Sequence, residues 1–191
     1  TMKQNLAFWR QLEAFEPFCE QEENDRRLML QYGTLFDDLL TRDNEMAHLT
    51  ASAWIVTRDQ SRVLLAYHNQ FRSGAWLGGH ADGDGDLLAV ALREAQEESG
   101  IVHVQPVSRK LFSVEILPVA QHRKHGRYVS AHLHLNATYL LECDASDALR
   151  IKPDENSGVK WFRPSEVAGA VSEPEMRIIY QKLMDKVALL Y

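Results

Sequence analysis

The feature that most constrains this chain is the run ALREAQEESGI at residues 91–101, which combines apolar periodicity with clustered acids. On a helix that turns about 100° per residue, Glu94, Glu97 and Glu98 fall within an arc of about 100°. The leucines and alanines of the same run occupy the neighbouring arc, and Glu98 lies nearest to them. We therefore predict an amphipathic helix with three carboxylates on one face, of which that of Glu98 is shielded from water.

Three carboxylates on one helix face require a compensating charge. Arg93 is the only cation of the run, and one guanidinium cannot neutralise three acids. Mg²⁺ and Mn²⁺ prefer oxygen ligands, and carboxylates at i, i+3 and i+4 can be held close enough to coordinate them. Two interpretations follow: a metal-binding face, or a solvated acidic face on which Arg93 pairs with Glu97 one turn away.

A glycine pair and an acidic, glycine-rich loop, in the segment WLGGHADGDGDLLAV at residues 76–90, precede this helix. Glycine lets the backbone approach a phosphate or a metal closely. Asp86 is a suitable N-cap residue and Gly100 a suitable stop, so we expect the helix to extend from about Asp86 to Ser99.

Together, residues 79–101 (GHADGDGDLLAVALREAQEESGI) resemble the Nudix box. That pattern is Gly, five residues, Glu, seven residues, then Arg-Glu-apolar-x-Glu-Glu-x-Gly-apolar. One position departs from it, because Gly85 stands where the pattern has its first Glu, although one of the neighbouring acids Asp82, Asp84 and Asp86 could substitute. The residues that match in register are Gly79, Arg93, Glu94, Ala95, Glu97, Glu98, Gly100 and Ile101.

The resemblance implies an α/β fold, a Nudix-like α/β/α sandwich with a mixed sheet. It also implies a reaction in which divalent metals, Mg²⁺ or Mn²⁺, are held against a diphosphate while water attacks a phosphorus atom. By position, Glu94, Glu97, Glu98 and the Gly79 carbonyl would bind the metals, and Glu94 or Glu97 would help to deprotonate the water. Arg93 would orient the glutamates by ion pairing.

Many members of this family use a further acid from a loop ahead of a strand that contains tryptophan. In IKPDENSGVKWF, Glu155 lies six residues before Trp161, so it is the residue we expect in that role, as a ligand or as a general base. The alternative is that Glu155 is an ordinary loop carboxylate.

At 191 residues the chain has room for one well-packed domain with a small appendage. We expect a helical N-terminal extension at residues 1–44, with helices up to Phe15 and from Leu28 to Leu40 on either side of a charged break at residues 21–27. A Nudix hydrolase-like domain follows at residues 45–191. Its expected strands are residues 47–56, 62–68, 109–117, 128–142 and 158–162, with a loop at 68–80 and closing helices that start near Pro164 and Pro174.

The charge and hydropathy of the chain argue against two classes of binding partner, nucleic acid polymers and membranes. A net charge of −6 argues against binding to a nucleic acid polymer, and no apolar run is long enough to span a bilayer. The two cysteines, Cys19 and Cys143, lie far apart in the sequence, which indicates a reducing compartment. We expect a cytoplasmic protein with a small nucleotide-type substrate, and a homodimer by default.

Histidine is the less expected feature. His132 and His134 lie on one face of an expected strand, His48 begins the first strand, and His80 follows the glycine pair. His48 and His80 resemble two metal ligands of isopentenyl-diphosphate isomerase, another branch of the superfamily, with His132 and His134 in place of its two acids. Such a set would favour Zn²⁺, Mn²⁺ or Fe²⁺ over Mg²⁺. Alternatively, these are ordinary strand histidines with separate hydrogen-bond partners.

The isomerase's cysteine before the Gly-His pair is absent, since Gly78 occupies that place, and this argues against isomerase chemistry.

The residues expected to bind substrate are Tyr67, Arg72 and Trp76 ahead of the box, and Arg127 in a basic segment that could equally be a solvated hairpin tip.

Two functions are therefore compared. One is a metal-dependent hydrolase that cleaves a diphosphate linkage in a nucleoside diphosphate derivative, and it is supported by the three intact glutamates. The other is a non-catalytic Nudix-fold domain that senses a nucleotide or binds a partner, and Gly85 favours it.

Overall fold

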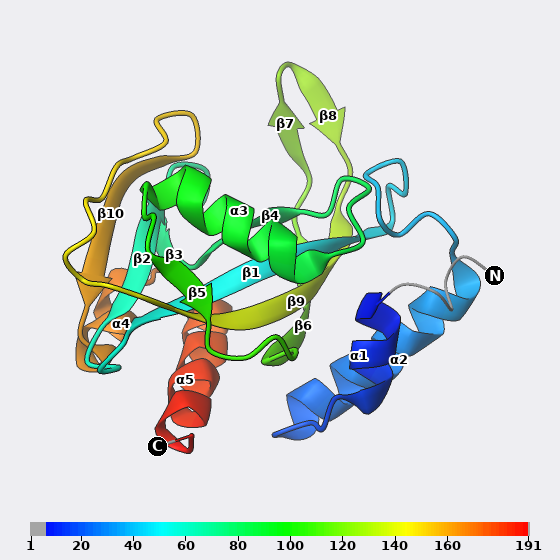
Figure 1. Cartoon of the computed structure of the whole chain (residues 1–191). Helices are drawn as coiled ribbons and strands as arrows, with labels where there is room; N and C mark the ends of the chain where they lie inside the picture. The colour runs from blue at the N-terminus through cyan, green and yellow to red at the C-terminus, as the bar shows by residue number, and fades with distance from the viewer. Residues whose placement is uncertain (1–6, 191) are drawn as a thin grey trace. The chain divides into compact units, whose positions relative to one another are not determined.

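The computed structural model describes residues 7–190, and the chain divides into two compact units, each built from separate segments. The first unit contains the chain up to Ala51 together with Gly79–Val90 and Lys110–Thr138. The second contains Ser52–Gly78, Ala91–Arg109 and the chain from Tyr139 onward. Figure 1 gives the order of the elements along the chain.

Eight of the strands form one sheet with the order β10-β2-β1-β9-β5, in which β3 pairs with β2, β4 with β1, and β6 with β9, and two further strands form a separate sheet. All eleven residues of β1 are buried, as expected for a central strand. The loop predicted at residues 68–80 instead contains the short strands β3 and β4, because residues 73–75 pair with β2. The bounds are β1 Ala47–Thr57, β2 Val63–His68, β3 Ser73–Ala75, β4 Leu77–His80, β5 Val104–Pro106, β6 Ser113–Val119, β9 His132–Cys143 and β10 Asn156–Phe162.

In the first unit, α1 (Ala7–Ala14) and α2 (Glu20–Leu35) confirm a helical N-terminal region, but the predicted charged break is wrong. The charged residues form the first half of α2, because they bond to strand β6. Gln21 Nε2 donates to the Val114 carbonyl at 2.9 Å, and the backbone N–H of Ile116 donates to Asp25 at 2.9 Å. The helix also ends at Leu35 rather than Leu40, since Phe36 is extended. Leu6, assigned to the first helix, lies outside the described residues.

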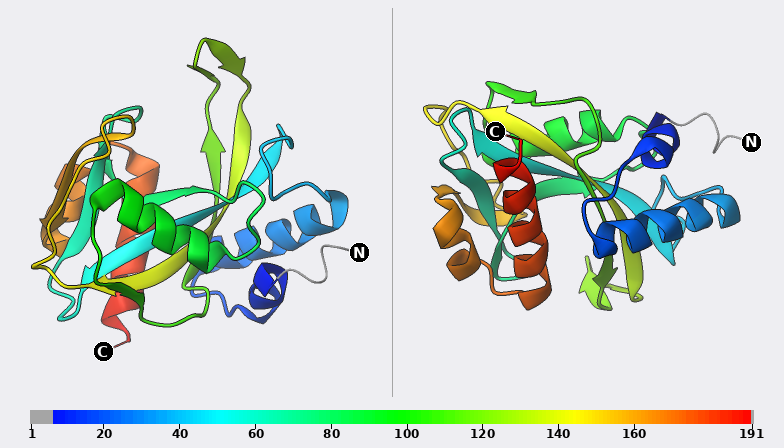
Figure 2. Two further views of the ribbon diagram at one scale, coloured as in Figure 1. Left: turned by 45° about the horizontal axis from the view of Figure 1, so that its top comes forward. Right: turned by 90° about the horizontal axis from the view of Figure 1, so that it is seen from below.

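The second unit shows the layering of an α/β/α sandwich. The part of α3 (Leu87–Ser99) that belongs to it lies on one side of its strands and α5 (Pro174–Ala188) on the other (Figures 1 and 2). Helices α4 (Pro164–Ala170) and α5 start at the predicted prolines, whose fixed φ suits a first helical turn. The rings of Trp54 and Tyr180 lie 5.2 Å apart between β1 and α5. The predicted fold class is confirmed.

The boundary between an extension at 1–44 and a domain at 45–191 stays a prediction. Within residues 7–190, none of the helices has the length and apolar character that crossing a membrane requires.

Candidate active site

Helix α3 begins and ends as local sequence rules predict. Asp86 precedes its first residue, and the carboxylate of Asp86 accepts a hydrogen bond from the backbone N–H of Ala89 at 3.0 Å. Gly100 follows its last residue with φ of +77°, in the left-handed region that favours glycine. A Cβ at this position would also lie 2.9 Å from the Cβ of Arg150. These two residues therefore set where α3 begins and ends.

An acidic cluster, defined here as Glu94, Glu98 and Glu155, lies in the second unit. One carboxylate oxygen from each residue lies within 4.8 Å of the others. Glu94 and Glu98 come from the same face of α3, and Glu155 comes from the loop directly before β10. The structure thus brings together two acids of the helix motif and the distant acid chosen from the sequence.

Glu98 is the most deeply buried member of this cluster, with 2% of its surface exposed, as the helix pattern predicts. The pKa of Glu98 is raised to about 8, chiefly by burial and also by the neighbouring carboxylates Glu155 and Glu94, against the lowering effect of a hydrogen bond from the Gly78 N–H at 3.0 Å. Burial, followed by Glu97, also raises the pKa of Glu94. Ionised carboxylates so close together and so shielded are stabilised by a bound cation, so the residues fit a divalent metal.

Asn156 positions the loop that carries Glu155. Its side chain, which is almost fully buried, donates to the backbone carbonyl of Glu98 at 3.0 Å. Its own backbone N–H donates to the Lys152 carbonyl at 2.8 Å, which closes the turn around Glu155. Sequence reasoning missed Asn156, because nothing in its spacing indicates that it bonds to the end of α3.

Lys152 is a second residue that the sequence reasoning missed. Its Nζ lies 2.8 Å from the Glu155 carboxylate and 3.7 Å from that of Glu97. The hydrogen bond to Glu155 is the main cause of its raised pKa. The i, i+3 spacing of Lys152 and Glu155 was the available signal.

The other motif residues do not belong to the acidic cluster as defined here. Glu97 is half exposed and faces Lys152, and Arg93 is exposed on α3. Gly79, the predicted carbonyl ligand, is a half-buried residue of β4. Their roles in metal binding and catalysis stay predictions.

The aspartates around Gly85, all of which lie in the first unit, accept hydrogen bonds from nearby groups. The carboxylate of Asp82 accepts two hydrogen bonds from Arg42, at 2.9 and 3.0 Å. That of Asp84 accepts one from the Asp86 N–H at 3.0 Å. Each acid therefore stabilises the loop or the helix start, and replacement of the missing Glu by one of them stays a prediction.

The four predicted substrate-binding residues differ in their exposure and in the elements that carry them. Tyr67 and Arg72 are exposed, and Arg72 has a positive φ of 48°. Trp76 is less free, since its backbone N–H donates to the Tyr180 hydroxyl at 3.1 Å and its ring meets that of Tyr180 edge-on. Arg127 is exposed on β8 (Arg127–Val129), which pairs with β7 (His122–Lys124) in a hairpin of the first unit.

The histidines of the sequence pattern also converge, in the first unit. His48, His80 and His134 each place a ring nitrogen within 4.8 Å of the other two, and His132 lies beside them, its ring 4.9 Å from that of His48.

The sequence of the chain matches a known protein family. A family model for the NUDIX domain matches residues 46–186, which is well over half of the chain. The chain therefore belongs to the Nudix family. No curated protein sequence matched it.

Solved structures share the fold at low sequence identity. A Nudix-family hydrolase from Clostridium perfringens is 19% identical, covers 73% of this chain and 97% of its own, and has a TM-score of 0.52. The Nudix hydrolase RenU from M. smegmatis is 16% identical, with coverage of 75% and 88% and a TM-score of 0.55. A C. elegans Ap4A hydrolase is 17% identical, with coverage of 76% and 98% and a TM-score of 0.51.

Proposed function

We propose that the chain is a metal-dependent Nudix hydrolase that cleaves a diphosphate linkage in a nucleoside diphosphate derivative. The convergence of Glu94, Glu98 and Glu155 within 4.8 Å of one another carries this proposal. Family membership supports it, as does the Ap4A hydrolase among the structures with a similar fold. Mg²⁺ or Mn²⁺ is the proposed cofactor, because all three side chains offer oxygen ligands.

When bound, the divalent ion neutralises charge on the phosphate oxygens and makes water a better nucleophile. Glu98 and Glu94 would hold the ion from α3, and Glu97 of the same helix would add a further ligand. Glu155 accepts the proton of the attacking water or adds a ligand. Lys152, at 2.8 Å, keeps Glu155 oriented, and Arg93 orients the helix glutamates.

The proposed substrate is a small nucleotide. Tyr67 or Trp76 would stack on its base, and the cation Arg72 would meet its phosphates. This assignment rests on residue type and on the exposure of Tyr67 and Arg72.

The alternative is a non-catalytic domain that senses a nucleotide or binds a partner. Gly85 favours it, since the family pattern has a glutamate there and the nearby aspartates have local partners. The three gathered carboxylates favour the hydrolase.

The experiment is phosphate release from a panel of nucleoside diphosphate derivatives, with Mg²⁺ or Mn²⁺ and a coupling phosphatase. We compare the native chain with Glu98→Gln, which keeps the side-chain volume, and with Glu16→Gln as a matched change at an exposed residue. We expect the Glu98 variant to lose at least about 100-fold in kcat, because the loss of a metal-ligating charge weakens transition-state stabilisation. The Glu16 variant should retain native turnover. The proposal would be contradicted if the native chain released no phosphate from any compound of the panel, or if Glu98→Gln kept full activity.

A further inference from the structure

A second cluster of metal-binding side chains lies in the first unit, and the proposed hydrolysis does not use it. We call His48, His80 and His134 the histidine cluster. Its members come from three different strands, β1, β4 and β9. The three ring centroids are separated by 5.2 Å between His48 and His80, 5.0 Å between His48 and His134, and 4.9 Å between His80 and His134. One nitrogen of each ring lies within 4.8 Å of the other two, so a single ion could reach all three.

The hydrogen bond at one end of His48 determines what its other end offers. Its Nδ1 lies 3.1 Å from the backbone carbonyl oxygen of Asn44. A carbonyl can only accept, so Nδ1 carries the proton and Nε2 of the neutral ring presents a lone pair. His132 is held in the same way, with Nδ1 2.8 Å from the Ser130 carbonyl. An imidazole whose Nδ1–H is fixed by a backbone carbonyl is the usual arrangement of a metal-ligating histidine.

Two ring nitrogens of the histidine cluster are buried without a hydrogen-bond partner among residues 7–190. His48 is 5% exposed, and its Nε2 is buried without a hydrogen bond from any described group. The same holds for Nε2 of His134. Buried polar atoms are paired in the great majority of cases, so two such nitrogens at one point indicate that something else binds them there.

The burial and spacing of the rings favour a cation over an anion. Positive charges on three imidazoles this close together would repel one another, and burial disfavours a charged ring, so the cluster offers lone pairs rather than positive charge. An anion site would require protonated rings.

We propose that His48, His80 and His134 form a binding site for a transition metal of the Zn²⁺ class, separate from the acidic cluster. Neutral imidazole suits Zn²⁺ and its neighbours, whereas Mg²⁺ prefers oxygen. The adjacent Asp82 is engaged by Arg42, so the ring nitrogens supply the bonds. His132, with its ring 5.2 Å from that of His134, is placed to contribute a fourth nitrogen. The metal would link β1, β4 and β9 where β4 leads into the acidic loop.

The test is a titration of the full chain, freed of metal with a chelator, in excess Mg²⁺ so that the acidic cluster is filled. Co²⁺ is the probe, because its visible d–d absorption reports coordination, and Zn²⁺ is the competitor. We expect one equivalent of Co²⁺ to give strong bands that one equivalent of Zn²⁺ abolishes. His48→Gln and His134→Gln, tested separately, should each weaken binding by at least about 100-fold, since each removes one of few ligands.

Two control variants separate this site from others. His125→Asn changes an exposed histidine of the hairpin turn, whose φ of 50° asparagine tolerates, and it should bind Co²⁺ as the native chain does. Glu98→Gln should also bind Co²⁺ as the native chain does. A failure of the hydrolase proposal would therefore not count against the metal site at the histidine cluster. Absence of tight Co²⁺ or Zn²⁺ binding to the native chain would overturn the inference, whether or not a variant folds. Native affinity in both histidine variants would overturn it as well.

Discussion

Glu98 combines deep burial with a carboxyl group whose pKa is strongly raised. Its carboxylate receives one hydrogen bond from the protein backbone, that of Gly78, and it has Glu94 and Glu155 as neighbours. The helix pattern alone predicts this shielding, because Glu98 borders the apolar stripe of α3. It does not predict Lys152 or Asn156, whose contacts with the acidic cluster depend on how the loop before β10 meets the helix.

The buried Glu98 predicts an unusual pH dependence for the metal-free protein. Its pKa is raised to about 8 from an ordinary value of 4.5, so between these values the folded state binds more protons than the unfolded state. The free energy of unfolding should therefore fall as the pH rises through this interval. Thermal unfolding in a chelator from about pH 5 to about pH 9 measures it.

Glu98→Gln should remove most of this decline, because glutamine stays neutral and can still accept the Gly78 hydrogen bond. Glu16→Gln, at an exposed position, should keep the native profile. Parallel pH profiles for the native chain and Glu98→Gln would show that Glu98 does not carry the effect.

At the scale of elements, helices with clear caps are predictable and those held by tertiary bonds are not. Asp86 and Gly100 delimit α3 from local chemistry alone. The charged first half of α2 has no such signal, since its stability depends on bonds to β6, including one between the Ser113 hydroxyl and the buried Glu22 at 2.8 Å. The histidine cluster is similar, because strand alternation alone shows only the pair His132 and His134, and the expectation that His48 and His80 join them comes from the resemblance to the isomerase.

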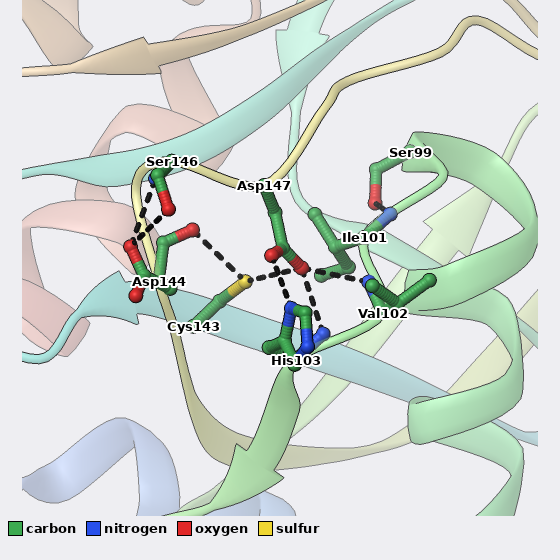
Figure 3. A network of polar contacts seen from close by, with 8 residues as sticks. All are labelled: Ser99, Ile101, Val102, His103, Cys143, Asp144, Ser146 and Asp147. Atoms are coloured by element: carbon green, nitrogen blue, oxygen red, sulfur yellow. Dashed lines mark hydrogen bonds and ion pairs between the residues drawn. The ribbon is translucent and has the colours of Figure 1, made fainter.

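A network at Asp147 joins the segment after β9 to the start of β5 (Figure 3). Its carboxylate accepts backbone hydrogen bonds from Val102 at 2.8 Å and His103 at 2.7 Å, and its other oxygen lies 2.6 Å from His103 Nδ1. The bonds from His103 are the main reason that the pKa of Asp147 is well below its ordinary value of 3.8.

Because this pKa is lowered on folding, the network's stabilisation is present above about pH 4 and is lost as the pH falls below it. Asp147→Asn should lower the melting temperature at neutral pH, since an amide cannot replace all three acceptor bonds. The difference from the native chain should shrink in acid. Melting curves across the acid range test this, and a constant difference at every pH would refute it.

For the whole molecule, the family and fold class follow from one segment of the sequence, residues 79–101, and the structure and the comparisons confirm both. The site is predicted less completely. Glu155 joins Glu94 and Glu98 as expected, whereas Glu97 faces Lys152. The residues predicted to bind substrate stay predictions, since Tyr67 lies near the end of β2 and Arg72 in the turn before β3, where no spacing rule determines the side-chain geometry.

The central claim is that Glu94, Glu98 and Glu155 together hold the divalent ion on which hydrolysis depends. The most direct measurement is Mn²⁺ binding by electron paramagnetic resonance, with one equivalent of Zn²⁺ to fill the histidine cluster, in the native chain and in each single Glu→Gln variant. Each of the three variants should bind Mn²⁺ at least about 10-fold more weakly, while Glu16→Gln binds it as the native chain does. Native Mn²⁺ affinity in all three variants would contradict the claim.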